Sequence, residues 1–239
     1  MTALTLTQDL ARKARLAGLL YLIIIITGLG AELGLRAPLI DFGDADATAA
    51  AILAAPGQFQ LAIAADLVMA LSDAGLAILL YLIFRAVAPG LALSAMVFRL
   101  IQTVIIAASL MALLASWLLL TSRDQLADAP ALALVFLDLH SHGYDLGLVF
   151  FGVNSLIMAF LIWHSGLFAK AFGAGLAIAG VVYLIGSGLR LFEPEWSAGF
   201  APVYILTILA ETAFCLRLIT QRGTQSPSQE RPNSHQHEH

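Results

Sequence analysis

The sequence predicts an all-α polytopic membrane helix bundle with about six transmembrane helices, and three observations indicate this fold class. Sixty per cent of the 239 residues are hydrophobic and only 12% are charged, whereas an average soluble domain is roughly 45–50% apolar and about 25% charged. A water-soluble fold of this length has too little interior to bury so much apolar surface. Several stretches also reach the roughly 20 mostly apolar residues that a helix needs to cross about 30 Å of hydrocarbon.

Charged residues, proline or glycine bound each of the predicted helices. The first run follows Arg12, Lys13 and Arg15 as in a signal peptide. No small-residue cleavage site follows it, so we expect a retained helix. The six windows cover residues 15–35, 60–84, 91–120, 141–164, 170–190 and 200–220.

The segments outside these windows predict three further features. Residues 44–55 are rich in alanine after Asp44, which indicates a short surface helix with an aspartate cap. Residues 130–139 either extend the fourth helix or form a separate short helix, and both alternatives stay open. From Gly223 the chain is rich in Ser, Pro, Gln, Asn and His, which is typical of a disordered tail. The expected division is a cytoplasmic segment 1–14, a transmembrane domain 15–222 and a cytoplasmic tail 223–239.

Orientation follows from the lysines and arginines, because cytoplasmic loops carry an excess of positive charge. An N-terminus in the cytoplasm puts eight of these residues inside and three outside; the outer ones are Arg36, Arg123 and Arg190. All three tryptophans also fall near predicted helix ends, as aromatic anchors do. We therefore expect a multi-pass protein of the bacterial inner membrane with both termini in the cytoplasm.

Composition also excludes several classes of function. The net charge is −4 and the basic residues are scattered singly, without a stripe that could neutralise phosphates, so no nucleic-acid partner is expected. The single cysteine, Cys215, lies in an apolar run and cannot build a disulfide framework or a cysteine-rich metal site. Dinucleotide, P-loop and nucleophile-elbow patterns are absent. The lipid bilayer is the expected partner, and no cofactor is predicted.

Ionisable residues within the windows predict an intramembrane polar cluster. Each such residue costs roughly 2.5–3.5 kcal/mol to insert, so it normally faces the protein interior. At about 1.5 Å per residue, Asp73 and Arg99 lie at a common depth and Glu211 lies near the midplane. We expect Arg99 to pair with one of these carboxylates, leaving the other to be protonated, bind a cation or contact water. The remaining expected members are Asp66, Gln102 and Asn154. The alternative is a structural ion pair that fixes helix neighbours.

A second polar cluster is expected toward the outer ends of the helices. On a continuous helix Asp138, His142 and Asp145 share one face and His140 and Tyr144 share another. Glu32, near the outer end of the first helix, and Asp66, in the outer third of the second, lie at a compatible depth. Two imidazoles with carboxylates can hold a divalent metal whose bound water is a nucleophile. The candidate ligands are Asp138, His140, His142 and Asp145. No HExxH-type motif accompanies them, and a hydrated polar rim is the alternative.

Four segments carry a family resemblance. They are Ala17-Gly-Leu-Leu-Tyr-Leu-Ile, Ala64-Ala-Asp-Leu-Val-Met, Phe98-Arg-Leu-Ile-Gln, and Leu137-Asp-Leu-His with Gly143-Tyr-Asp-Leu-Gly-Leu-Val-Phe-Phe-Gly. Over residues 14–219 the chain resembles the bacterial membrane proteins catalogued as domain of unknown function 4386. The resemblance implies a bacterial multi-pass membrane protein without an assigned activity, and it transfers no functional residue. His142 fits the family pattern less well.

Three functions remain as hypotheses. The leading one is a polar site among the second, third, fourth and sixth helices that opens outward and binds or passes a small solute or ion. The second is a metal-assisted intramembrane hydrolase that uses His140 and His142. The third is an accessory subunit whose buried charges only set helix packing.

Overall fold

The computed structural model describes residues 7–122 and 128–223, and every long element within them is helical. Six helices are long and apolar enough to cross a membrane, which confirms the expected fold class. They cover Gln8–Arg36, Pro56–Phe84, Pro89–Thr121, Ala129–Ser165, Lys170–Phe192 and Pro194–Ile219. Most of the expected tail lies outside the described residues.

The first span consists of α1 (Gln8–Leu29) and a π-helix, η1 (Gly30–Arg36). A short helix α2 (Ala45–Ala54) follows, and then the long helices α3 (Pro56–Phe84), α4 (Pro89–Thr121), α5 (Ala129–Ser165) and α6 (Lys170–Phe192). The last span consists of α7 (Pro194–Phe200), η2 (Ala201–Tyr204) and α8 (Ile205–Ile219). Proline occupies the first turn of α3, α4, α5 and α7, where the missing N–H breaks no helical bond.

Residues 130–139 extend the fourth helix and do not form a separate one. Helix α5 begins at Ala129 and continues without a break to Ser165. Its 37 residues extend for about 55 Å at 1.5 Å per residue, well beyond the hydrocarbon thickness. The extension packs against α2, which begins where Asp44 Oδ1 accepts a hydrogen bond from the Ala47 amide at 2.9 Å. The expected aspartate-capped surface helix is thereby confirmed.

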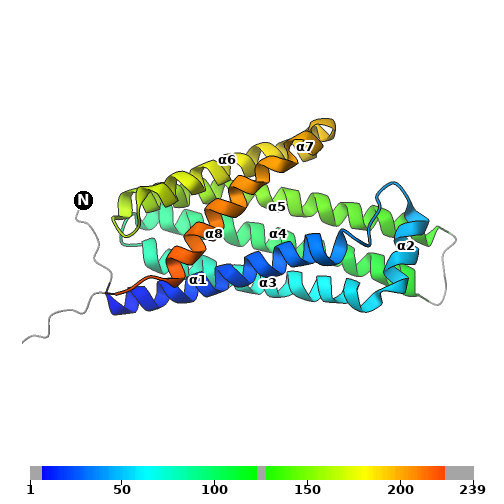
Figure 1. Ribbon diagram of the computed structural model, residues 1–239, viewed down its shortest axis with the longest axis horizontal. Helices are drawn as coiled ribbons and strands as arrows, with labels where there is room; N and C mark the ends of the chain where they lie inside the picture. The colour runs from blue at the N-terminus through cyan, green and yellow to red at the C-terminus, as the bar shows by residue number, and fades with distance from the viewer. Residues whose placement is uncertain (1–6, 123–127, 224–239) are drawn as a thin grey trace, which may run out of the picture.

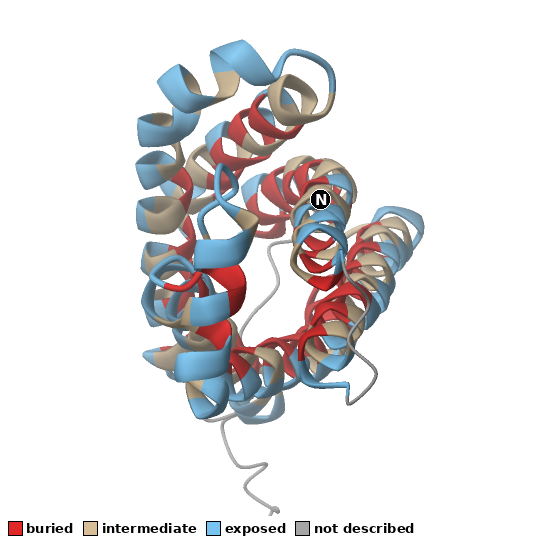
Figure 2. Cartoon of the chain, turned by 90° about the vertical axis from the view of Figure 1, so that its right-hand side faces the viewer, coloured by how far each residue is buried: buried red, intermediate tan, exposed pale blue. Residues whose placement is uncertain are grey.

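The long helices run alternately up and down, so that the start of α1 and the end of α8 lie at one end of the bundle (Figure 1). We call this the terminal end, and the opposite end, which carries α2 and α7, the α2 end. Neighbouring helices pack in the order α1, α3, α4, α5, α6, and α8 lies obliquely across α1 and α6 (Figure 1). Viewed along the bundle, the buried faces turn inward and the exposed faces outward (Figure 2).

Two apolar cores enclose a polar layer. The core at the terminal end contains Leu76, Phe84 and Phe214, whereas the core at the α2 end contains Phe59 and Leu137. Along α3, α4 and α5 the buried charged residues lie between these two groups. Large apolar side chains cover the outside of the bundle, as expected for helices embedded in a lipid bilayer.

Glycines bring α5 close to α4 within the polar layer. A Cβ atom on Gly143 would lie 2.8 Å from Cβ of Ser109, and one on Gly147 would lie 2.8 Å from Cγ1 of Ile106. Small residues of this kind allow membrane helices to approach closely. The close approach sets the polar side chains of α5 against α4.

Candidate intramembrane polar site

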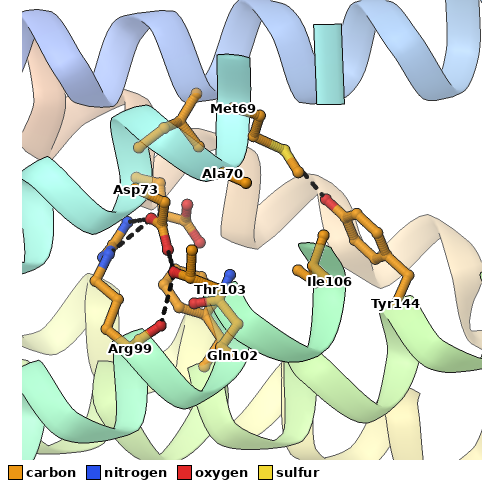
Figure 3. A pocket seen from close by; sticks show the side chains of 11 residues that line it. Met69, Ala70, Asp73, Arg99, Gln102, Thr103, Ile106 and Tyr144 are labelled. Atoms are coloured by element: carbon orange, nitrogen blue, oxygen red, sulfur yellow. Dashed lines mark hydrogen bonds and ion pairs between the residues drawn. The ribbon is translucent and has the colours of Figure 1, made fainter. Parts of the chain in front are cut away.

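A buried ion pair joins α3 to α4 near the middle of the bundle. Nε and Nη2 of Arg99 lie 2.8 and 2.6 Å from Oδ1 of Asp73, and both residues are only 3% exposed. The Thr103 hydroxyl donates to the other carboxylate oxygen at 2.5 Å (Figure 3). Asp73 is therefore satisfied at both oxygens, and of the two partners expected for Arg99 it is the one that pairs.

Two aromatic rings hold the arginine from further helices. The Arg99 guanidinium carbon lies 5.3 Å from the ring centroid of Tyr21 on α1 and 5.0 Å from that of Phe151 on α5. Such contacts stabilise a cation more strongly where water is excluded. The Arg99–Asp73 pair is thus enclosed by α1, α3, α4 and α5.

Glu211 on α8 is a second buried carboxylate, 7% exposed. The Tyr183 hydroxyl of α6 donates to its Oε1 at 2.7 Å, and among the described residues no cation forms an ion pair with it. Tyr183 was not among the residues expected from sequence, because neither its depth nor its chemistry distinguishes it from other membrane tyrosines. The site consequently holds one arginine and two carboxylates.

A cavity of about 40 Å³ lies beside this pair. Since one water needs roughly 10–15 Å³, the cavity has room for about three waters. The amide oxygen of Gln102, a residue only 8% exposed, has no hydrogen-bond partner among the described residues. The lining comes from α1, α3, α4, α5 and α8 and consists of Ile24, Met69, Ala70, Asp73, Arg99, Gln102, Thr103, Ile106, Tyr144, Phe151 and Glu211 (Figure 3).

Two residues expected in this cluster lie elsewhere. Asn154 of α5 is buried, but with Arg99 and Tyr81 it lines a gap that has no room for water. Asp66 of α3 forms an ion pair with Arg36. It lies seven residues before Asp73, two turns nearer the α2 end.

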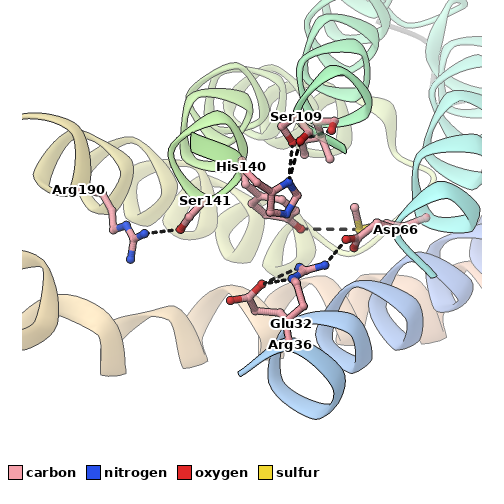
Figure 4. A network of polar contacts seen from close by, with 10 residues as sticks. Glu32, Arg36, Asp66, Ser109, His140, Ser141 and Arg190 are labelled. Atoms are coloured by element: carbon pink, nitrogen blue, oxygen red, sulfur yellow. Dashed lines mark hydrogen bonds and ion pairs between the residues drawn. The ribbon is translucent and has the colours of Figure 1, made fainter. Parts of the chain in front are cut away.

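Asp66 therefore belongs to a second network, at the α2 end. Arg36 in η1 is 3% exposed and forms an ion pair with Asp66, which is fully buried. Nη2 of Arg36 also lies 2.6 Å from Oε2 of Glu32, whose side chain is 61% exposed (Figure 4). Sequence reasoning placed Arg36 at a helix boundary. The Glu32–Arg36 spacing of four residues was the available signal, since such residues share a helix face.

The two histidines of α5 face different surroundings, whereas a shared metal site would need both rings to face one point. His140 is 4% exposed, and its Nδ1 lies 3.1 Å from the Ser109 hydroxyl of α4, while Nε2 has no partner among the described residues (Figure 4). The ring of His142 is half-exposed and its Nδ1 lies 3.3 Å from Oδ1 of Asp138. Two positions two residues apart differ by about 200° around a helix, which explains the separation.

Asp145, the remaining metal candidate, pairs with a residue of α6. Nε of Arg190 on α6 lies 2.8 Å from its Oδ2, and Arg190 also donates to Ser141 (Figure 4). Within residues 7–122 and 128–223, no three His, Cys, Asp or Glu side chains gather as metal ligands would. The four candidates do not converge on one point: Asp138 and His142 lie against each other, whereas His140 turns to α4 and Asp145 to α6.

Tyr144 lies between the two networks. Its hydroxyl donates to the Met69 sulfur at 3.7 Å, and both residues line the central cavity. Along their helices Met69 is three residues from Asp66, and Tyr144 is four from His140. A Cβ atom on Gly28 would lie 2.8 Å from that sulfur, so α1 closes tightly over the contact. Met69 and Tyr144 thus separate the cavity from the Arg36–Asp66 pair.

Comparison with known proteins identifies the chain by family alone. No curated protein and no solved structure matches it. Residues 16–221 match the family model described as Domain of unknown function (DUF4386), which confirms the resemblance in the sequence. The match covers all six spans almost completely. The chain belongs to the DUF4386 family of multi-span membrane proteins.

Proposed function

We propose that this membrane protein binds or passes a small solute or ion at the central cavity. The observation that carries the proposal is the surplus carboxylate. Glu211 is buried beside a cavity with room for about three waters, and Arg99, the arginine that lines this cavity, already pairs with Asp73. A buried ion pair that only fixed helix neighbours would require neither the cavity nor the second acid. Ionisable residues within membrane helices are costly, and they commonly mark ion and substrate pathways.

The proposal includes an orientation. The α2 end faces outward, with both termini in the cytoplasm of a bacterial cell, and the site is reached from the outside. The support is the positive-inside count, together with the string of polar residues that runs from exposed Glu32 through Arg36 and Asp66 toward the cavity. Within this proposal, residues 15–222 form the transmembrane domain, flanked by cytoplasmic segments 1–14 and 223–239.

The two alternatives receive different support. A metal-assisted hydrolase needs ligands converging on one point, and the described residues offer no such group. An accessory subunit is compatible with the Arg36–Asp66 and Arg99–Asp73 pairs, which join η1 to α3 and α3 to α4. It does not account for Glu211 or the cavity.

The test is a flux measurement on protein reconstituted into vesicles. Proton, alkali-cation, chloride and small neutral-solute flux is compared for wild type, Asp73→Asn and empty vesicles. The matched control is Asp138→Asn, because Asp138 is half-exposed and remote from the cavity. We expect the wild-type flux of at least one of these species to exceed that of empty vesicles. Asp73→Asn should reduce this flux, whereas Asp138→Asn should not. Wild-type flux equal to that of empty vesicles for every species, together with no rise in melting temperature with any of them, would reject the proposal in favour of an accessory subunit.

A further inference from the structure

We infer that the central cavity binds one small monovalent cation, held by Glu211 and the amide oxygen of Gln102 beside the Arg99–Asp73 pair. The inference rests on the proposed function and names the chemical class of the ligand. Three independent features of the cavity lead to it: its charge, its unpartnered hydrogen-bonding group and its size.

The charge of the site requires a single positive occupant. Arg99 and Asp73 neutralise one another through two close N–O contacts, while the hydroxyls that face Glu211, those of Tyr183 and Tyr21, are neutral. One negative charge therefore remains in a buried region, where an uncompensated charge is strongly unfavourable. An anion would add to the imbalance, and a divalent cation would reverse it. A monovalent cation removes it.

The hydrogen-bonding groups favour the same occupant. The Gln102 amide oxygen is a buried acceptor without a donor among the described residues, and Gln102 lines the same cavity as Glu211. Carboxylate and amide oxygens are the ligands that hard cations prefer. The same oxygens accept hydrogen bonds from ammonium or hydronium. A cation thus satisfies an acceptor that the protein leaves open.

The groups facing Glu211 do not supply a competing charge. Tyr183 of α6 donates to it, and the ring of Tyr204 in η2 packs on Tyr183. From α1 the facing group is Tyr21, which is also in contact with Arg99. Across the cavity lie Arg99 and Asp73, already paired. The neighbours are otherwise neutral, so Glu211 alone determines the surplus charge.

The size of the cavity restricts the ligand further. About 40 Å³ accommodates an alkali or ammonium ion with one or two waters, but not a sugar, an amino acid or a quaternary amine. Sodium, potassium, ammonium and the proton share the single positive charge. These four ions are the arms of the experiment.

The experiment measures the melting temperature of the purified full-length protein in detergent. Sodium, potassium and ammonium chloride are titrated separately at constant pH, with choline chloride keeping the ionic strength constant because choline is too large for the cavity. Protonation of Glu211 is followed in choline buffer by the infrared carbonyl band of a protonated carboxyl group across a pH series. The variants are Glu211→Gln, Gln102→Leu and the exposed control Asp138→Asn.

We expect a saturable rise in melting temperature with at least one ion, or a carbonyl band that Glu211→Gln removes. Glu211→Gln should abolish the ion response, Gln102→Leu should weaken the apparent affinity roughly tenfold, and Asp138→Asn should leave it unchanged. Should Glu211→Gln fail to fold, Glu211→Asp retains the charge on a shorter side chain and should retain a weaker response.

Two results would overturn the inference. One is the absence of any ion response and of the carbonyl band in wild type, with water alone satisfying Gln102; the other is a response that survives in Glu211→Gln. Flux of chloride or a neutral solute in vesicles, without cation binding, would leave the proposed function standing and remove only this inference. Absence of both flux and binding would remove both.

Discussion

Two buried networks in this protein have the same chemical composition, one arginine and two carboxylates, but they differ in where the second carboxylate lies. Arg36 pairs with Asp66, and its second acid, Glu32, is 61% exposed. Arg99 pairs with Asp73, and the second acid of its network, Glu211, is 7% exposed beside a cavity. Water can solvate the surplus charge at the α2 end. At the centre, only an occupant of the cavity can balance it.

The largest difference between the networks should follow from removal of each arginine. Arg99→Ala removes the partner of Asp73 and leaves it beside the second unpaired buried carboxylate, Glu211. Arg36→Ala leaves only Asp66 buried and unpaired, because Glu32 remains hydrated. We expect Arg99→Ala to lower the free energy of unfolding by about 3–5 kcal/mol, and Arg36→Ala to lower it by less. Thermal melting of the detergent-solubilised variants measures both. An equal or larger loss for Arg36→Ala would contradict the comparison.

Neutralising the second carboxylate should act differently in the two networks. In choline buffer, at a pH above that at which the carbonyl band of protonated Glu211 disappears, no small cation occupies the cavity. Under these conditions Glu211→Gln removes an uncompensated buried charge and keeps an oxygen for the Tyr183 hydroxyl. We expect it to raise the free energy of unfolding by about 1–3 kcal/mol. Glu32→Gln should lower it by less than about 1 kcal/mol, since exposed ion pairs contribute little. Chemical denaturation in choline buffer gives both values, and destabilisation by Glu211→Gln would show that its charge is already compensated.

Adding a single methyl group at Gly28 should lower stability, because Gly28 packs closely on Met69 between the two networks. A Cβ atom at Gly28 would lie 2.8 Å from the Met69 sulfur, whereas a Cβ atom at Gly30 meets nothing within 4 Å. We expect Gly28→Ala to be about 1 kcal/mol less stable than Gly30→Ala, since Met69 must shift toward Tyr144. Melting temperatures of the two variants measure the difference. Equal melting temperatures would mean that Met69 can move away from residue 28 without a loss of stability.

The smallest expected effect is that of Tyr144→Phe, which removes only the hydroxyl that donates to the Met69 sulfur. We expect a loss of about 0.5 kcal/mol, the lower end for a hydrogen bond, because a thioether is a weak acceptor. The same variant should increase flux into the cavity, since the side chain that separates the two networks is held less firmly. Tyr81→Phe is the control, as Tyr81 lies outside the cavity lining. Unchanged flux in Tyr144→Phe would show that this contact does not limit access.

Sequence reasoning located residues along the helices better than around them. Residue counts from each helix end set the depth of a side chain, so Arg99 was expected to pair with Asp73 or Glu211, and it pairs with Asp73. The face that each residue presents depends on helix rotation and on the order of neighbours, which depth does not determine. This is why His140 and Asp145 were grouped as metal candidates although they face α4 and α6.

Arg36 illustrates a second limit of sequence reasoning. A charge at the end of an apolar run normally marks the membrane boundary, and Arg36 was interpreted in that way. The chain instead continues as a π-helix through Arg36, and the guanidinium is buried against Asp66. Apolar periodicity does not distinguish a π-turn from the end of a helix. The partner of Asp66 was therefore missed, and Asp66 was assigned to the central cluster, although its depth was also compatible with the outer cluster that contains Glu32.

The most direct test of the account compares ion flux in vesicles containing wild type, Glu211→Gln or Glu32→Gln. The two substitutions are chemically identical and differ only in whether the acid is buried beside the cavity or exposed at the α2 end. The account predicts that the ion flux of Glu32→Gln equals that of wild type. The flux of Glu211→Gln should be lower by roughly tenfold or more, which corresponds to a difference of about 1.4 kcal/mol. Wild-type flux in Glu211→Gln, or an equal loss in both variants, would contradict it.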